Sequence, residues 1–462
     1  MFESQIYIER RRNLKEKFES GLLLFVGNTE SPANYAANTY AFRQDSTFLY
    51  YFGLDLPGLS AIIDIDGNTS ILYGNELTVD DVVWMGPQPG LSELAEKSGI
   101  DRSEEYPTLN NVLSEALRKS RKIHFLPQYR AEQHLELSGL TGINPNRIND
   151  YASKELIKAV IEQRSVKSEE EIKEIDAAVD IAYRMHTAAM KIIKPGITEK
   201  KIAGMIEGIA LSLGAGLSFR PIVSINGQIL HNPYHENEIK EDSLLVIDSG
   251  AETDMHYASD ITRTMPGGGK FKEKQKSIYE IVLSSQMNAI ENVKPGITNK
   301  ELHLIAAKTI VEGLSGLGIM HGNVDEAVQV GAHALFYPHG LGHMMGLDVH
   351  DMEGLGEDFV GYDENIKRSD QFGLAYLRLA KQLKPGYVFT IEPGIYFIPA
   401  LIDKWKEENR YTEFINYERV EDYRDFGGIR IEDNILVTEN SYRLLGKPIP
   451  KTVVEVESLC SK

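Results

Sequence analysis

The sequence of 462 residues contains a single cysteine, Cys460. One cysteine excludes an intramolecular disulfide and any metal site that needs several thiolates. A chain of this size without disulfides is typical of a reducing compartment. We therefore expect a cytoplasmic protein.

Long apolar runs are also missing. The longest, such as residues 21–26, have the length of a strand, far short of the about 20 residues that a membrane-spanning helix needs. The first 18 residues contain no apolar core of signal-peptide length. The sequence thus predicts a soluble protein with no membrane partner.

Positive charge is scarce, since 49 Lys and Arg face 68 Asp and Glu and the formal net charge is −19. This balance argues against a nucleic-acid partner, because neutralising phosphates needs a basic surface. It also argues against docking on anionic membranes. Hydrophobic residues make up 42% and charged residues 25%, which are ordinary values for a globular protein. The length suggests two or three domains.

The first part of the chain alternates between strand and helix patterns. Short apolar runs predict strands at 22–26, 60–65, 69–73 and 122–126, and helical patterns lie at 91–98, 109–120 and 154–163. Ser168 and Glu171 then form a capping box that starts a new helix. We predict a small α/β domain over residues 1–165 and a second domain over 166–462.

The second part contains an internal repeat. Lys194-Pro-Gly-Ile-Thr198 recurs as Lys294-Pro-Gly-Ile-Thr298, and residues 240–250 resemble residues 384–394. Each of the latter segments has a turn, an apolar strand, a carboxylate and a glycine. Two common turn patterns could coincide here. Alternatively, an α/β half is duplicated, and two strands each bring a carboxylate to a shared centre.

Carboxylates and histidines gather in this second part. Asp248 ends the apolar run 244–247, and Asp260 follows twelve residues later in an alternating pattern over 257–264 that predicts a second strand. Glu392 follows the apolar strand pattern in residues 384–394, and Glu432 lies in an alternating pattern over 428–433 that predicts a strand. The segment from His339 to His343 is glycine-rich, which predicts an irregular loop rather than a zincin helix.

Such oxygen and imidazole ligands suit Mn²⁺, Co²⁺, Fe²⁺ or Zn²⁺ in a two-metal site. Spacing alone does not select these four acids from the 68 in the chain.

Six motifs in a fixed order resemble the metallopeptidase family of the pita-bread fold, which includes methionine aminopeptidase, Xaa-Pro aminopeptidase and prolidase. They span about residues 166–445: Val-Ile-Asp248-Ser-Gly, Ser-Asp260-Ile-Thr-Arg-Thr, His339-Gly-Leu-Gly-His343, Leu-Asp-Val-His350-Asp, Ile-Glu392-Pro-Gly and Arg430-Ile-Glu432-Asp. The resemblance implies an α+β catalytic domain with a pseudo-two-fold internal repeat. It also implies two divalent ions held by Asp248, Asp260, His343, Glu392 and Glu432, with Mn²⁺ as the first choice and Co²⁺, Zn²⁺ or Fe²⁺ as alternatives.

The segment 40–53 resembles the N-terminal domain of Xaa-Pro aminopeptidases and prolidases, which methionine aminopeptidases lack. On its own, this segment is interpreted as an aromatic strand in a core. Creatinase has the same pair of domains but lacks the metal ligands. Because the ligand set is complete here, a non-catalytic binding protein on the same fold is disfavoured.

The resemblance also implies roles for individual residues. A metal-bridged hydroxide would attack the carbonyl before proline, and Glu392 would carry a proton to the leaving nitrogen. His350 would stabilise the oxyanion. His231 would line the substrate pocket, and His235 is the alternative for that role.

Four further residues are implied around this centre. His339 and Arg430 would support the metal ligands from behind, although His339 could also be a loop histidine bound to the backbone. Arg378 would grip a substrate carboxylate, or lie on the surface of a helix. Trp84 would close the active site, in some relatives that of a neighbouring subunit, or pack locally.

We therefore expect a two-metal Xaa-Pro aminopeptidase that acts on small peptides with proline at the second position. Prolidase, which cleaves only dipeptides, is the close alternative, because the insert 354–383 and Arg378 match its pattern. Relatives form dimers or tetramers, so a homodimer or homotetramer is expected.

Overall fold

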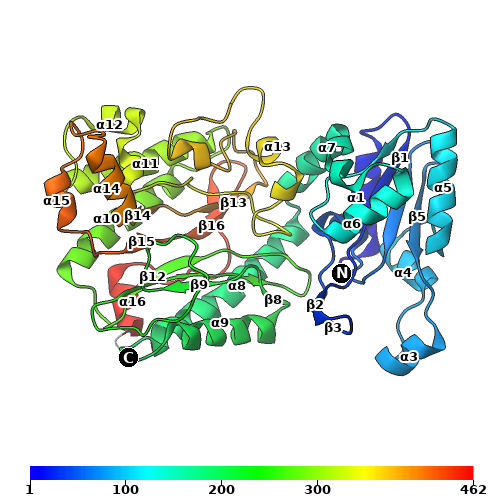
Figure 1. Cartoon of the computed structure of the whole chain (residues 1–462), viewed down its shortest axis with the longest axis horizontal. Helices are drawn as coiled ribbons and strands as arrows, with labels where there is room; N and C mark the ends of the chain where they lie inside the picture. Colours follow the sequence, from blue (N-terminus) through cyan, green and yellow to red (C-terminus); the bar gives the residue numbers. More distant parts are fainter. Residues whose placement is uncertain (461–462) are drawn as a thin grey trace. The chain divides into compact units, whose positions relative to one another are not determined.

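The computed structural model describes residues 1–460 and contains two compact units (Figure 1). The first unit comprises residues 1–164 with 353–359, and the second comprises residues 165–352 and the chain from Val360 on. The N-terminal unit has an α/β fold.

The first unit is built on a mixed five-stranded sheet with strand order β6-β5-β4-β1-β7. The strands are β1 (Leu22–Val26), β4 (Ser60–Asp64), β5 (Thr69–Gly74), β6 (Arg102–Glu105) and β7 (Ile123–His124). The central pairs β1–β4 and β4–β5 are antiparallel, whereas β5–β6 and β1–β7 are parallel. A separate hairpin joins β2 (Pro32–Tyr35) and β3 (Asn38–Thr39).

The helices of the first unit are α1 (Ser4–Lys15), α2 (Ser46–Phe52), α3 (Val79–Met85), α4 (Leu91–Ser98), α5 (Tyr106–Arg118), α6 (Ala131–Thr141), the 3₁₀ helix η1 (Pro145–Tyr151) and α7 (Lys154–Ser165). Leu22, Leu24 and Val26 alternate along β1, and their side chains pack with Leu109 of α5 and Leu137 of α6. The apolar face that alternation produces on β1 packs against the apolar face of α5, and together they form the core.

The aromatic segment 40–53 forms helix α2 and not the strand that its composition alone suggests. The carboxylate of Asp45 accepts hydrogen bonds from the backbone N–H groups of Thr47 and Phe48 and caps the helix. Gly53 ends it with a left-handed φ of 67°. Every residue of α2 is buried, so the local caps decide the structure against the strand propensity of aromatic residues.

The second unit contains two similar halves. In the first half, α8 (Glu169–Ile192) and α9 (Glu199–Leu213) precede the strands β8 (Gly216–Leu217), β9 (Ile222–Ser224), β10 (Leu244–Asp248), β11 (Ala251–Glu252) and β12 (Thr262–Pro266). In the second half, α10 (Glu273–Glu291) and α11 (Asn299–Gly316) precede β13 (Val388–Ile391), β14 (Gly394–Tyr396), β15 (Gly428–Arg430), β16 (Asp433–Val437) and β17 (Tyr442–Leu444). Each half has an antiparallel three-stranded sheet, with orders β12-β10-β9 and β13-β16-β17.

Shorter helices complete the second half: α12 (Val324–Val330), η2 (Ala332–Leu335), η4 (Leu374–Tyr376), α14 (Pro399–Glu407), α15 (Tyr417–Glu421) and α16 (Val453–Cys460). The element η3 (Glu353–Leu355) and the start of α13 (Glu357–Gly361) belong to the first unit.

The repeated Lys-Pro-Gly-Ile-Thr segments perform the same task in both halves. The hydroxyl groups of Thr198 and Thr298 cap α9 and α11. Gly196 and Gly296 both have left-handed φ values, 86° and 93°, which suit glycine. Each also donates its N–H to a residue near the next sheet, namely to Ile239 and Leu383. The duplication is therefore a property of the fold, and the coincidence of turn patterns is the wrong interpretation.

Among residues 1–460, no helix combines the length and apolar character that a membrane crossing requires.

Candidate metal centre

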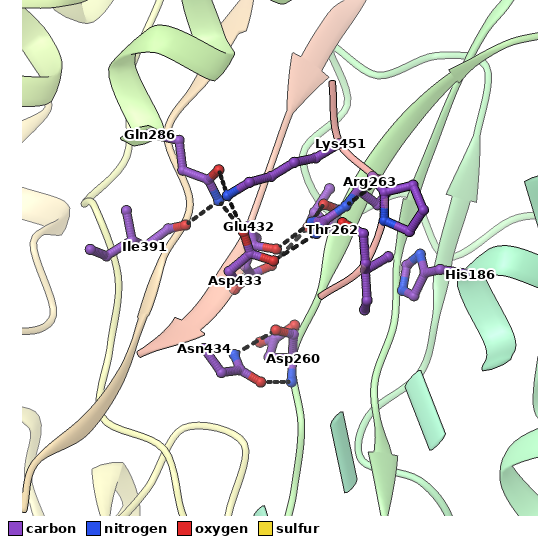
Figure 2. A network of polar contacts seen from close by, with 12 residues as sticks. His186, Asp260, Thr262, Arg263, Gln286, Ile391, Glu432, Asp433, Asn434 and Lys451 are labelled. Atoms are coloured by element: carbon purple, nitrogen blue, oxygen red, sulfur yellow. Dashed lines mark hydrogen bonds and ion pairs between the residues drawn. The ribbon is translucent and has the colours of Figure 1, made fainter. Parts of the chain in front are cut away.

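Asp248 and Asp260 come from neighbouring strands of the first half. Asp248 ends β10 and pairs in register with Thr262, the first residue of β12. Asp260 lies two residues before Thr262, and one of its carboxylate oxygens lies within 4.8 Å of a carboxylate oxygen of Asp248. The strand predicted over 257–264 begins only at Thr262, because the backbone N–H and C=O of Asp260 bind the side-chain amide of Asn434 at 3.1 and 2.6 Å (Figure 2).

Glu432 lies in the two-residue link between β15 and β16. Its N–H donates to the carbonyl of Thr262 at 3.1 Å, and its Oε2 accepts from Thr262 Oγ1 at 2.8 Å. The continuous strand expected over 428–433 is interrupted here, since β15 pairs with β14 while β16 pairs with β13. This change of partner brings Glu432 beside the carboxylates of the first half.

His343 and Glu392 approach the same point from the second half. The N–H of His343 donates to Thr390 Oγ1 at 3.1 Å, and Thr390 returns its N–H to the carbonyl of His343 at 3.0 Å. The Nδ1 of His343 lies 3.1 Å from the Met344 carbonyl, a contact that leaves Nε2 as the unprotonated ligand atom. Nε2 lies 3.4 Å from Asp260 Oδ2 and 3.8 Å from Glu392 Oε1.

These side chains form three overlapping groups, in each of which one ligand atom per residue lies within 4.8 Å of the others. The groups are Asp260, His343 and His350; His343, Glu392 and Glu432; and Asp248, Asp260 and Glu432. Glu432, Asp260 and His343 each belong to two groups. Such sharing is the arrangement that a pair of ions with bridging carboxylates requires.

Unpartnered oxygen atoms show that the residues fit cations. Asp248 Oδ1, Asp260 Oδ1 and Glu432 Oε1 are buried and have no hydrogen-bond partner among residues 1–460. A buried carboxylate oxygen without a partner is costly unless a proton or a cation satisfies it. Carboxylate and imidazole donors suit first-row divalent ions, so we identify a candidate site for two metal ions.

The carboxylates also repel one another. Burial raises the pKa of Asp260 and of Glu432 well above its ordinary value, and neighbouring carboxylates raise it further. Burial likewise raises the pKa of Glu392, although the positive charge of Arg430 opposes the rise. A divalent ion would remove this repulsion and favour the ionised forms.

Arg430 contacts Asp248 from behind. One terminal nitrogen donates to Asp248 Oδ2 at 2.6 Å, the other donates to Tyr396 Oη at 2.9 Å, and Nε donates to Thr262 Oγ1 at 3.1 Å. Because Thr262 Oγ1 also donates to Glu432, one guanidinium orients two candidate ligands. The second oxygen of Asp248 stays available for an ion.

His339 supports this arrangement through Tyr396. Its Nε2 lies 2.9 Å from Tyr396 Oη, and its Nδ1 lies 2.8 Å from the carbonyl of Gly340. Burial, followed by the charge of Arg430, lowers the pKa of His339 to about 3, so the imidazole is neutral. His339 and Arg430 thus both contact the hydroxyl group of Tyr396.

The predicted substrate-binding residues surround the acidic cluster. The rings of His350 and His343 lie 4.0 Å apart. Partial burial and the charge of Arg430 lower the pKa of His231, and Asp248 opposes this effect. His235, the alternative to His231, instead binds the carbonyl of Pro221 at 3.0 Å.

Arg378 and Trp84 differ in their surroundings. Arg378 lies two residues beyond the short 3₁₀ helix η4, so the helix surface expected as its alternative is absent. Its positive charge lowers the pKa of His231 and opposes the rise in the pKa of Glu392, which places it near both. Trp84 lies on α3 of the first unit and is 85% exposed, and its role in closing an active site stays a prediction.

Several supporting residues were not anticipated from the sequence. Their side chains bind candidate ligands, the backbone of these ligands or the supporting Arg430. Thr262 lies within one of the six motifs, and Thr390, Tyr396 and Asn434 lie within two residues of another. His186 of α8 is fully buried and bonds the carbonyl of Ser249, next to Asp248, at 3.1 Å. No local pattern distinguishes it from the apolar face of its helix.

Comparisons with family models and with curated proteins agree on one family. The model of metallopeptidase family M24 matches residues 173–439, and that of the aminopeptidase P N-terminal domain matches residues 7–124. The human Xaa-Pro dipeptidase is 32% identical over 455 residues, which cover 95% of this chain and 89% of that protein. A probable Xaa-Pro aminopeptidase of Aspergillus terreus is 32% identical over 433 residues, with 91% and 89% covered.

Solved structures agree over the whole chain. Aminopeptidase P from E. coli, in a zinc-substituted form with product, superposes with a TM-score of 0.82 at 30% identity and covers 100% of this chain and 98% of that one. Aminopeptidase PepP from Pseudomonas aeruginosa has the same TM-score and coverage at 27% identity. The two-unit architecture and the duplicated pita-bread catalytic fold are therefore those of this family.

Proposed function

The chain belongs to metallopeptidase family M24, and we propose that it is a two-metal Xaa-Pro aminopeptidase, which removes an N-terminal residue that precedes proline. The observation that carries this proposal is the cluster of Asp248, Asp260, His343, Glu392 and Glu432, three of whose buried oxygens have no partner among the described residues. The full-length similarity to Xaa-Pro peptidases supports the substrate class.

Bound divalent ions would supply Lewis acidity, which acidifies water and polarises a carbonyl group. The chain's own residues then have distinct tasks. Glu392 would accept a proton from the attacking water and deliver it to the leaving nitrogen. Proline makes this step necessary, because its amide nitrogen carries no hydrogen and must be protonated as the bond breaks.

Histidines and arginines would position the substrate. His350, beside His343, donates a hydrogen bond to the carbonyl oxygen as negative charge develops there. His231 lines the pocket, and partial burial and then the charges of Arg430 and Arg378 lower its pKa. Arg430, held by Tyr396 and His339, keeps Asp248 in one orientation.

For the metal we propose Mn²⁺, with Co²⁺, Zn²⁺ or Fe²⁺ as alternatives. Four carboxylates and one imidazole form a hard, oxygen-rich donor set, which suits Mn²⁺ better than a thiolate site would. Loading the metal-free protein with each ion and measuring hydrolysis of one Xaa-Pro-Yaa peptide tests the order.

Prolidase is the second candidate, and a specific observation favours it. Arg378 carries its charge close to His231 and Glu392, where a guanidinium could bind the free carboxylate of a dipeptide. The relatives include both Xaa-Pro dipeptidases and Xaa-Pro aminopeptidases at similar identity. The length of the accepted peptide therefore decides between the two.

The deciding experiment compares substrates of different length. Mn²⁺-loaded protein is given an Xaa-Pro dipeptide and the matched Xaa-Pro-Yaa and longer peptides, and kcat/KM is measured for each. The aminopeptidase proposal expects cleavage of the longer peptides. Cleavage of the dipeptide alone would establish the prolidase, and no cleavage by metal-loaded protein would contradict both.

An Arg378→Leu variant sharpens this comparison. If Arg378 binds a dipeptide carboxylate, KM for the dipeptide rises at least tenfold, whereas KM for a long peptide changes little. Arg378→Lys keeps the charge but loses the bidentate geometry, so an intermediate KM is expected. Equal effects on short and long substrates would contradict this role.

We also propose that the protein forms a homodimer or homotetramer. Within each chain we propose two folding domains, residues 1–165 and 166–462. Helix α3 supports association, because none of its residues is buried, and Val79, Val83 and Trp84 are 80%, 71% and 85% exposed. An apolar helix that is stable through its Thr78 capping box but covered by nothing within its unit suits a protein contact. Sedimentation of the wild type and of Val83→Ser with Trp84→Ser tests this, and a monomeric wild type would refute it.

A further inference from the structure

A sealed polar network lies directly behind Glu432 (Figure 2). Successive side chains of an extended segment point to opposite sides, so Glu432 faces the acidic cluster while Asp433 faces away from it. The same alternation holds on β12: Thr262 donates to Glu432, and its neighbour Arg263 donates to Asp433 at 2.6 Å. Two cross-strand pairs thus lie back to back.

Arg263 links three segments of the chain. It is fully buried, and its nitrogens donate to carbonyl oxygens of Thr262 at 2.9 Å, Glu432 at 2.6 Å, Ile449 at 3.0 Å and Pro450 at 3.1 Å. The bond to the Glu432 carbonyl fixes the backbone of a candidate ligand. The bonds to residues 449 and 450 tie the segment before α16 to the same place.

The other oxygen of Asp433 extends the network toward a second ligand. Asp433 Oδ2 accepts from Lys451 Nζ at 2.7 Å and from Gln286 Nε2 at 3.1 Å. Lys451 also donates to Gln286 Oε1 at 2.9 Å. Gln286 Nε2 in turn donates to the carbonyl of Ile391 at 3.3 Å, the residue before Glu392.

The network therefore holds the backbone at or beside two ligands, Glu432 and Glu392, which share one candidate metal group with His343. We propose that Asp433, Arg263, Lys451 and Gln286 are positioning residues, and that they set the affinity of the ion held by His343, Glu392 and Glu432. This inference rests on the two-metal site of the proposed function. It assigns a role in metal binding to the segment 449–451, which contributes no ligand.

Electrostatic repulsion and backbone positioning predict opposite changes in metal affinity when a charge of the network is removed. The fully buried Arg263 and the partly buried Lys451 face one buried anion, so the network carries excess positive charge beside a site for cations. If electrostatic repulsion governed the effect, removing the charge of Lys451 would tighten metal binding. If the network acts by holding the ligand backbones in place, removal weakens binding, and partners behind metal ligands typically change affinity by 10- to 100-fold.

The test uses the full-length metal-free protein and Lys451→Met, whose apolar chain keeps much of the lysine volume. Titration calorimetry with Mn²⁺ measures the affinity and stoichiometry, and visible absorption of bound Co²⁺ reports the ligand geometry. We expect one of two ions to bind about tenfold more weakly in Lys451→Met, with an altered Co²⁺ spectrum. Lys451→Arg should restore binding to within about threefold, because it keeps a donor to Asp433.

Lys447→Met is the matched control, since Lys447 is exposed in the same segment and lies over the Tyr183 ring. It should leave both ions and the Co²⁺ spectrum unchanged. Gln286→Met, which removes the bond to the Ile391 carbonyl, provides a second variant should Lys451→Met fail to fold, and it should also weaken one ion.

The outcomes separate this inference from the proposed function. A wild type that binds two ions, together with Lys451→Met and Gln286→Met variants that bind them equally well or more tightly, overturns the positioning role alone. A wild type that binds no ions overturns the metal site and this inference with it. Selective weakening of one ion, rescued by Lys451→Arg, establishes the role.

Discussion

Glu432 and Asp433 are adjacent in the chain and both buried, but they lie on two sides with opposite chemistry. On one side, Glu432 joins other carboxylates, and its Oε1 has no hydrogen-bond partner among the described residues. On the other, both oxygens of Asp433 accept bonds from Arg263, Lys451 or Gln286. The protein supplies its own cations to one side and leaves the other side for cations from solution.

The acidities of the two side chains follow this division. Burial would raise the pKa of Asp433, but the charges of Arg263 and Lys451 outweigh it and hold the pKa below its ordinary value. Burial and the neighbouring acids raise the pKa of Glu432. Both side chains are buried, so burial does not explain why their pKa values shift in opposite directions. The sign of the neighbouring charges does, and four predictions test this explanation.

The largest effect is expected from Asp260→Ala. Asp260 belongs to two of the three ligand groups, so its loss removes an oxygen donor from each. Activity with Xaa-Pro-Yaa and Mn²⁺ should fall by about three orders of magnitude or more, or about 4 kcal/mol of transition-state stabilisation. Asp254→Ala, which alters an exposed acid in the preceding turn, should retain wild-type kcat/KM. Substantial activity in Asp260→Ala would refute the site.

Metal removal should abolish activity and also lower stability. A ligand that binds only the folded state, present at 100 times its Kd, stabilises it by about 2.7 kcal/mol. Thermal unfolding of the chelated protein should thus occur at lower temperature, and added Mn²⁺ should reverse the shift. The Asp260→Ala variant should show a smaller shift. A wild-type midpoint that does not respond to chelation would contradict the assignment of this side to metal ions.

The third prediction compares the two sides directly in metal-free protein. Asp433→Ala leaves the fully buried Arg263 and the partly buried Lys451 without their anion, which should cost about 3 kcal/mol of unfolding free energy. Asp260→Asn removes one of several repelling carboxylates and should stabilise the same protein by about 1 kcal/mol. Urea unfolding measures both. Equal signs for the two substitutions would show that the two sides do not differ as described.

The sequence alone predicted the candidate ligands better than their supports. The resemblance of six motifs to a known family, and not their spacing, selected Asp248, Asp260, His343, Glu392 and Glu432, and the structure brings them together. Arg263 lies within one of those motifs, but its partners Asp433 and Pro450 are 170 and 187 residues away. No periodicity reports a contact of that range, since only the folded topology creates it.

Local strand assignments failed where side chains replace backbone pairing. The amide of Asn434 takes both backbone bonds of Asp260, so the strand predicted over 257–264 begins only at Thr262. The aromatic run at 46–52 became helix α2, because Asp45 caps it. The duplicated halves, in contrast, could be inferred from Lys-Pro-Gly-Ile-Thr, since caps and left-handed glycines depend on nearby residues alone.

Glu136, a partly buried carboxylate of the first unit, has no cationic partner among residues 1–460 and gives the smallest expected effect. Glu136 of α6 accepts a hydrogen bond from the hydroxyl of Tyr106, and burial raises its pKa to about 7. A bound proton neutralises Glu136, whereas Arg263 and Lys451 balance the charge of Asp433. Between the ordinary value of 4.5 and about 7, folded protein binds more protons than unfolded protein. The unfolding free energy of the first unit should therefore fall as pH rises through this window.

Glu136→Gln isolates this contribution, because glutamine has the same shape and never ionises. The variant should match the wild type near pH 5 and become the more stable of the two by on the order of 1 kcal/mol at pH 8. Urea unfolding at pH 5, 6, 7 and 8 with saturating Mn²⁺ measures the difference while the metal ligands stay ionised. Glu132→Gln, at an exposed position of the same helix, should show no such trend. A pH-independent difference would contradict the raised pKa of Glu136.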